Sequence, residues 1–154
     1  MKKLFKLFTI FAMAVCLTLL CGCDLSHKHF QDGYGYCASC ETDTCEVLTR
    51  GIYNRYTSVE KTVGEQYQQD SFYKFVSNGE QGIKIEVLGV ERGSYSVSFY
   101  SRQTSSFYLE PSIDGAWYCH NDLNKGTTYY IKITFRQQGK ASILVRDLAF
   151  VVEE

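Results

Sequence analysis

Hydrophobic and polar residues alternate with a period of two along most of the chain after residue 46. Ile83, Ile85 and Val87 each have polar neighbours, and the same pattern recurs over residues 94–100 and 129–135. An apolar residue at every second position is typical of a strand with one buried and one solvated face. Further strands are expected near residues 47–53, 71–76, 116–119 and 142–151.

Glycine-containing turns separate these segments, for example at Asn78-Gly79 and Asp114-Gly115. Short strands punctuated in this way predict an all-β fold, an antiparallel β-sandwich of jelly-roll-like type, over residues 47–154. The chain also has 12 tyrosines and a single proline. Aromatic residues suit pleated, half-buried surfaces, so composition supports the same class. No stretch after the first 22 residues has the period of an amphipathic helix.

The first 22 residues follow a different pattern. Three lysines precede an apolar run over residues 7–21, which is shorter than the roughly 20 residues that a membrane-spanning helix needs. The run ends in Leu20-Cys21-Gly22-Cys23, which resembles the lipobox of bacterial lipoproteins. The resemblance implies a signal peptide over residues 1–22, cleavage before Cys23 and acylation of its thiol. The alternative is an ordinary secretory signal.

An exported protein held in a membrane by its acyl chains is therefore expected, and the sequence leaves the membrane and leaflet open. The three lysines leave with the leader, so 13 basic and 17 acidic side chains remain and the net charge becomes −4. This charge excludes the dense basic surface that nucleic-acid binding uses. Residues 23–46 are polar and lack a strand period, and we interpret them as a tether with a small cysteine-containing knuckle.

The order of segments after the tether is similar to the bacterial pre-peptidase C-terminal domain, a jelly-roll-like sandwich appended to secreted enzymes. The similarity rests on Leu123 and on the strand Gly126-Thr127-Thr128-Tyr129-Tyr130-Ile131, and it covers residues 57–152. The segment over residues 94–98 lacks the acidic residue that this family usually has before its central strand. The calcium site of the family is therefore not carried over.

Cysteines and histidines give the sequence its most reactive group. Its members are His27, His29, Cys37, Cys40, Cys45 and, far along the chain, Cys119. Two thiols three residues apart can bind one tetrahedral zinc ion with a histidine as third ligand. Thiols outside the cytoplasm are instead usually oxidised, and four cysteines remain after Cys23 is acylated. Disulfides are the second interpretation, with Cys45 paired to Cys37 or Cys40 and the remaining cysteine paired to Cys119. Free thiols are the third, and all three stay open.

Aromatic residues are candidates for ligand binding, because exposed rings can stack on sugars or form protein interfaces. The candidates are Tyr100, Tyr108, Trp117, Tyr118 and Tyr130. Packing as cross-strand pairs within the sandwich is the alternative for each ring.

Catalysis has little support in the sequence. His120 is the one histidine of the predicted sandwich, and no Gly-x-Ser-x-Gly motif occurs. We therefore predict a non-catalytic, membrane-anchored envelope lipoprotein that acts as a binding or interaction module, with an envelope protein or a polysaccharide as partner. The alternatives are a carbohydrate-binding sandwich and a zinc-stabilised knuckle that mediates protein interaction. No cofactor is expected besides that zinc ion.

Overall fold

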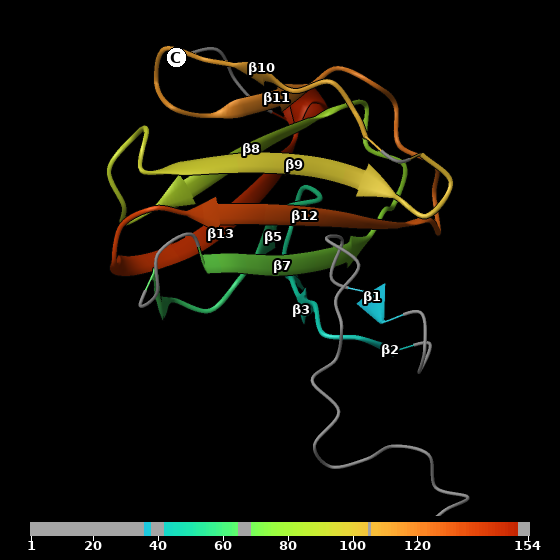
Figure 1. Cartoon of the computed structure of the whole chain (residues 1–154). Helices are drawn as coiled ribbons and strands as arrows, with labels where there is room; N and C mark the ends of the chain where they lie inside the picture. The colour runs from blue at the N-terminus through green and yellow to red at the C-terminus, as the bar shows by residue number, and fades with distance from the viewer. Residues whose placement is uncertain (1–35, 38–41, 65–68, 105, 151–154) are drawn as a thin grey trace, which may run out of the picture.

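The computed structural model describes residues 36–37, 42–64, 69–104 and 106–150 (Figure 1). These residues form two β-sheets that pack together and a separate ribbon in which β1 (Tyr36–Cys37) pairs with β2 (Thr42–Asp43). The predicted all-β sandwich is confirmed. Within the described part of the chain, no helix is long and apolar enough to cross a membrane.

The first sheet has four strands in the order β3-β7-β12-β9. They are β3 (Glu46–Val47), β7 (Gln69–Val76), β12 (Thr128–Phe135) and β9 (Tyr95–Ser101). β12 pairs antiparallel with both neighbours, as predicted, but β3 runs parallel to β7. The prediction of purely antiparallel pairing is wrong for β3, since the chain leaves this sheet at Leu48 and continues in the second one.

The second sheet has the order β10-β11-β8-β13-β5-β4. Its strands are β10 (Glu110–Pro111), β11 (Trp117–Cys119), β8 (Ile83–Leu88), β13 (Gly139–Asp147), β5 (Tyr56–Thr57) and β4 (Thr49–Arg50). β6 (Lys61–Val63) pairs with the start of β13, and the 3-10 turn η1 (Leu148–Phe150) follows it. The strand predicted over residues 47–53 is thus divided at Leu48 between two sheets, and the one over 142–151 ends at Asp147.

The core lies between the sheets and consists of the inward members of the alternation. Ile85 and Ile131 are fully buried there. The rings of Phe75, Phe99 and Tyr129 stack with centroids 5.4–6.3 Å apart. Each large apolar side chain buried in this way contributes about 1.5–3 kcal/mol to folding. The period-two pattern was therefore enough to identify the faces of the main strands.

β10 and β4 lie at opposite ends of the strand order in the second sheet. Their turns also lie at opposite ends along the strands. Trp117 pairs with Ile85, so the turn before β11 lies on the side of the sheet where β8 ends. Tyr56 pairs with Val145, so the turn before β5 lies on the side where β13 ends, and β8 and β13 are antiparallel. The two turns are therefore diagonally opposed on one sheet.

Candidate functional site

The turn between β10 and β11, residues 112–116, is held both by its own backbone and by side chains from another loop and strand; we call it the Ile113 turn. Its own backbone closes it, because the Ser112 N–H donates to the Ala116 carbonyl at 2.9 Å and the Gly115 N–H donates to the Ser112 carbonyl at 3.2 Å. Gly115 has a φ of 88°, in the left-handed region that glycine tolerates best. The Asp114-Gly115 pair in the sequence already indicated a turn here.

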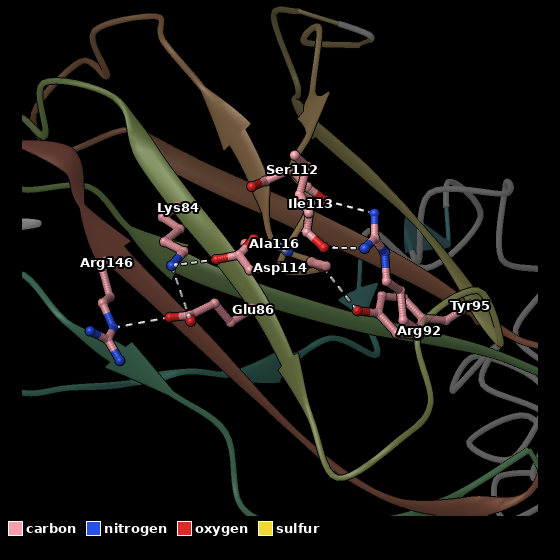
Figure 2. Close-up of polar contacts among 10 residues, drawn as sticks. Lys84, Glu86, Arg92, Tyr95, Ser112, Ile113, Asp114, Ala116 and Arg146 are labelled. Carbon is pink, nitrogen blue, oxygen red and sulfur yellow. Dashed lines mark hydrogen bonds and ion pairs between the residues drawn. The ribbon is translucent and has the colours of Figure 1, made fainter. Parts of the chain in front are cut away.

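Two side chains from the neighbouring β8–β9 loop and strand clamp this turn (Figure 2). The Arg92 guanidinium donates to the carbonyl of Ile113 and, at 2.9 Å, to the carbonyl of Ser112. The Tyr95 hydroxyl donates to the carbonyl of Gly115 at 3.1 Å. Three carbonyls of the turn, those of Ser112, Ile113 and Gly115, thus accept hydrogen bonds from side chains about twenty positions earlier in the chain. These bonds hold the backbone of the turn without any partner.

A line of charges extends from the turn across the outer face of the sheet (Figure 2). The Lys84 ammonium lies 3.1 Å from Asp114 and 3.4 Å from Glu86. Arg146 on β13 lies 3.0 Å from the second oxygen of Glu86, an ion pair without hydrogen-bond geometry. The network joins β8, β13 and the turn. Each partly exposed pair is worth only about 0–1 kcal/mol, so its main effect is on geometry.

Asp114 is the acidic member of this network that the turn itself supplies. Its pKa is lowered to about 2, first because the Ala116 N–H donates to the carboxylate and next because the Ser112 hydroxyl does. The Lys84 ammonium adds to the same effect. Burial by itself lowers the pKa of Lys84, but Asp114 and Glu86 raise it overall. Both groups therefore stay charged near neutral pH.

Ile113 stands at the tip of this fixed turn with 92% of its surface exposed. An exposed apolar side chain is unremarkable on a mobile loop. Here the backbone on both sides is hydrogen-bonded, so the main chain holds the isoleucine at one place in the solvent. Tyr108, shortly before β10, is also 77% exposed. Such ordered apolar tips are typical of residues that enter a pocket of a binding partner.

The structure separates the five aromatic candidates. Tyr100 and Tyr130 are buried and not exposed as the alternation suggested; they form a cross-strand pair of β9 and β12 with stacked rings 5.4 Å apart. Trp117 is half-buried and packs against the core, since it lies in register with the inward-facing Ile85. Tyr108 is exposed, and Tyr118 is half-exposed beneath the Lys84 ammonium. Stacking of these two rings on each other is the cross-strand alternative that the sequence left open.

His120 lies at the exposed end of β11. Its ring stacks beside Tyr118 at 6.1 Å, and its Nε2 lies 3.2 Å from the carboxylate of Glu110. Both side chains are more than half exposed. A hydrolytic arrangement would need this histidine in a closed polar pocket beside a nucleophile. The exposed His120–Glu110 pair does not provide that geometry.

Cys119 is a fully buried thiol in the hydrophobic core. Its sulfur lies 3.8 Å from the Asn121 side chain, and burial raises the pKa of the thiol. Among the described residues the thiol forms no disulfide, so a disulfide from Cys119 to the tether stays a prediction. The inward register of Cys119 with Ile83 directs the side chain between the sheets.

The other members of the cysteine and histidine group are only partly described. Cys45 is half-buried just before β3, and for Cys37 the structure describes only its place in β1. Cys23, His27, His29 and Cys40 lie outside the described residues. Within the described ranges, no three His, Cys, Asp or Glu residues form a group that could hold a metal ion. Zinc binding by the knuckle therefore stays a prediction.

A hollow of about 530 Å³ lies at one end of the four-stranded sheet. Lys74, Arg102, Thr128 and Tyr130 line it together with backbone of neighbouring loops. Both cationic residues, Lys74 and Arg102, already interact with other groups. The hollow therefore does not define the charge or the shape of a ligand, and the Ile113 turn remains the better-defined candidate site.

Comparisons with known proteins find similarity to solved structures but none to a protein family. No protein-family model matches the chain, and no curated protein matches it. Three solved structures align with 66% of the chain, each a PliG, a periplasmic inhibitor of g-type lysozyme. The Salmonella Typhimurium protein has 14% identity, a TM-score of 0.41 and 97% of its own chain covered. The Aeromonas hydrophila protein has 10% identity and a TM-score of 0.47, and a mutant from Escherichia coli has 10% and 0.41, each 96% covered.

These values are too low to assign the inhibitor's activity to this chain. The resemblance to the pre-peptidase C-terminal domain has no family match behind it and also stays a prediction. Sequence reasoning missed the two residues that define the candidate site. Arg92 was only part of a turn signal, and Ile113 had no pattern around it, because neither lies on a strand with a period.

Proposed function

We propose that the protein is a non-catalytic binding module of the cell envelope, lipid-anchored through Cys23, that binds a protein partner with the Ile113 turn. The observation that supports it most is the exposure of Ile113 on a turn whose carbonyls are held by Arg92 and Tyr95. A preformed loop loses little conformational entropy on binding, so an apolar tip on such a loop favours association.

The surroundings of the tip favour a protein over a sugar as partner. Trp117, the best stacking residue among the candidates, packs against the core. Ile113 has no aromatic face or hydrogen-bonding group for a sugar ring. An aliphatic tip beside the charged Asp114 instead suits an apolar pocket with a cationic or amide rim. The partner itself is not identified by the structures that share the fold.

Site-specific photo-crosslinking in cells tests this proposal. A diazirine-bearing aliphatic residue replaces Ile113 in one variant and Val59 in the control, because Val59 is 75% exposed and also β-branched. We expect one protein adduct from position 113 and none from position 59. The purified partner should then bind the wild-type protein at least tenfold more tightly than Ile113→Asp. Equal adducts at both positions, or no adduct at 113, would contradict the proposal.

The anchor has its own test. The intact mass of protein extracted from membranes should exceed that of the chain from Cys23 onward by a diacylglycerol group, usually with one more acyl chain. Cys23→Ser should abolish this increase and release the protein from the membrane fraction. An unmodified Cys23 in membrane-extracted protein would remove the anchor and leave the binding proposal untouched.

A further inference from the structure

The opposite edge of the same sheet has a second group of exposed apolar side chains. It consists of the hairpin between β4 and β5, residues 50–55, which we call the Tyr53 hairpin, together with Phe150 of η1. Ile52 is 76% exposed, Tyr53 67% and Phe150 53%. The rings of Tyr53 and Phe150 contact each other at 5.4 Å. Large apolar side chains that stand together in solvent mark an interaction surface.

The hairpin presents these side chains in a fixed backbone conformation. The Gly51 N–H donates to the Arg55 carbonyl at 2.6 Å, and Asn54 donates to the buried carboxylate of Asp147 at 3.2 Å. Tyr53 has a φ of 53° and Asn54 one of 47°, as in a type I′ turn. Such positions favour asparagine or glycine, and a tyrosine there is strained. The turn does not need the tyrosine ring in order to form. The presence of an exposed ring at this position therefore indicates a role other than stabilising the turn.

The charge of the hairpin is opposite to that of the protein. Residues 50–55 contain Arg50 and Arg55 and no acidic residue, whereas the whole chain has a net charge of −1. Both arginines are exposed. Aliphatic and tyrosine side chains beside exposed cations are the combination that contacts an anionic lipid surface. Tyrosine rings favour the level of the headgroups, and each nearby cation is attracted by the negative surface potential.

The position of the hairpin in the chain also favours contact with a lipid surface. β3 and β4 are the first strands of the sandwich, so the chain enters the fold only a few residues before Arg50. In a chain anchored through Cys23, on which this argument rests as part of the proposed function, the tether joins the sandwich beside this edge. The Ile113 turn lies diagonally across the sheet, away from the hairpin.

We propose that the Tyr53 hairpin docks on an anionic membrane surface. Arg50 and Arg55 contact the headgroup phosphates, and Ile52, Tyr53 and Phe150 insert at the boundary between headgroups and acyl chains. This contact orients the sandwich so that the Ile113 turn points away from the lipid. The proposal extends the proposed function but does not depend on the identity of the protein partner.

Fluorescence quenching by brominated lipids tests the orientation. Two variants of the full-length chain, Ile52→Trp and Ile113→Trp, form a matched pair of exposed isoleucines, and the parent protein with its one native Trp117 gives the baseline. Each is reconstituted into vesicles of brominated phosphatidylcholine with 30% phosphatidylglycerol. We expect the tryptophan at position 52 to be quenched at least threefold more than the one at 113. Phosphatidylcholine vesicles alone should remove most of that difference.

A further variant adds Arg50→Gln and Arg55→Gln to Ile52→Trp. Its quenching should fall to the level that Ile52→Trp shows without anionic lipid. Equal quenching at positions 52 and 113 would overturn the proposal. So would a photo-crosslink from position 52 to a protein without any quenching, because the hairpin would then bind a protein. Quenching at position 52 with no adduct from position 113 would overturn only the proposed function.

Discussion

The Ile113 turn and the Tyr53 hairpin both present exposed apolar side chains on a hydrogen-bonded backbone, but the bonds that hold the two backbones differ. The Ile113 turn is fixed from outside, by Arg92 and Tyr95 and by ion pairs on a partly exposed face. The Tyr53 hairpin is fixed from below, by a buried carboxylate, and has a strained residue at its tip. The difference teaches that loss of one contact at the Ile113 turn should cost little global stability, whereas loss of the buried carboxylate under the Tyr53 hairpin should cost much more.

Removal of the carboxylate under each turn should give the largest difference. Asp147 is buried and accepts bonds from Asn54 and from the backbone N–H groups of Gln81 and Ala149. Asp147→Ala should lower the free energy of unfolding by about 2–3 kcal/mol, because three partly buried donors lose one charged acceptor at the same time. Asp114→Ala should cost less than about 1 kcal/mol, since its ion pair is exposed. Urea denaturation measures both, and similar costs would contradict the contrast.

Backbone strain gives the next largest effect. Gly115→Ala should lower the free energy of unfolding by about 1 kcal/mol, since a Cβ is disfavoured at a φ of 88° although no backbone atom blocks it. Tyr53→Gly, the reverse change at the other turn, should cost less than about 0.5 kcal/mol, because released strain offsets the lost ring contact. A Tyr53→Gly variant that loses more stability than Gly115→Ala would show that the ring is structural.

Acid should weaken the Ile113 turn. The folded-state pKa of Asp114 lies at about 2, below the ordinary 3.8, so its stabilising contribution is present above pH 4 and is lost as pH falls toward 2. The difference in unfolding free energy between wild type and Asp114→Asn should shrink over that window. We expect a change of about 0.5–1 kcal/mol after solvent screening. A difference that stays constant from pH 5 to pH 2 would contradict this assignment.

The smallest effect on stability, and the most local, belongs to Arg92. Arg92→Ala should change the free energy of unfolding by less than about 1 kcal/mol, because the guanidinium is exposed. Hydrogen exchange at the amides of Ser112, Gly115 and Ala116 should nevertheless accelerate about tenfold. The amides of Gly51 and Arg55 serve as the internal control and should not change. Equal acceleration at both turns would mean that Arg92 supports the whole sandwich.

The sequence was sufficient for the parts of the fold that follow a period. The alternation at Ile83, Ile85 and Val87 identified both the strand and its buried face, and those residues are buried. The alternation was insufficient where one continuous segment supplies strands to both sheets, as it does on the two sides of Leu48. It also could not tell that the rings of Tyr100 and Tyr130 stack on each other and are buried. That outcome depends on which residues the register places side by side on two strands, and alternation within one strand contains no such information.

The candidate site was less predictable than the fold for a physical reason. Asp114-Gly115 marked a turn, but the geometry of the turn depends on Arg92, which comes from another loop. Contacts between residues twenty positions apart leave no local pattern. The reactive residues that the sequence emphasised do not form a site together. Cys119 is buried in the core, and His120 forms an exposed ion pair with Glu110.

The most direct test of the account concerns whether the Ile113 turn is built for a partner. The measurement is the yield of the protein adduct from a photoreactive residue at position 113, with and without Arg92→Ala, in cells that make equal amounts of folded protein. The account predicts that Arg92→Ala lowers the yield several-fold, while Arg50→Gln at the opposite edge leaves the adduct's identity unchanged. An undiminished yield without Arg92 would contradict the claim that a pre-ordered turn presents Ile113 for binding.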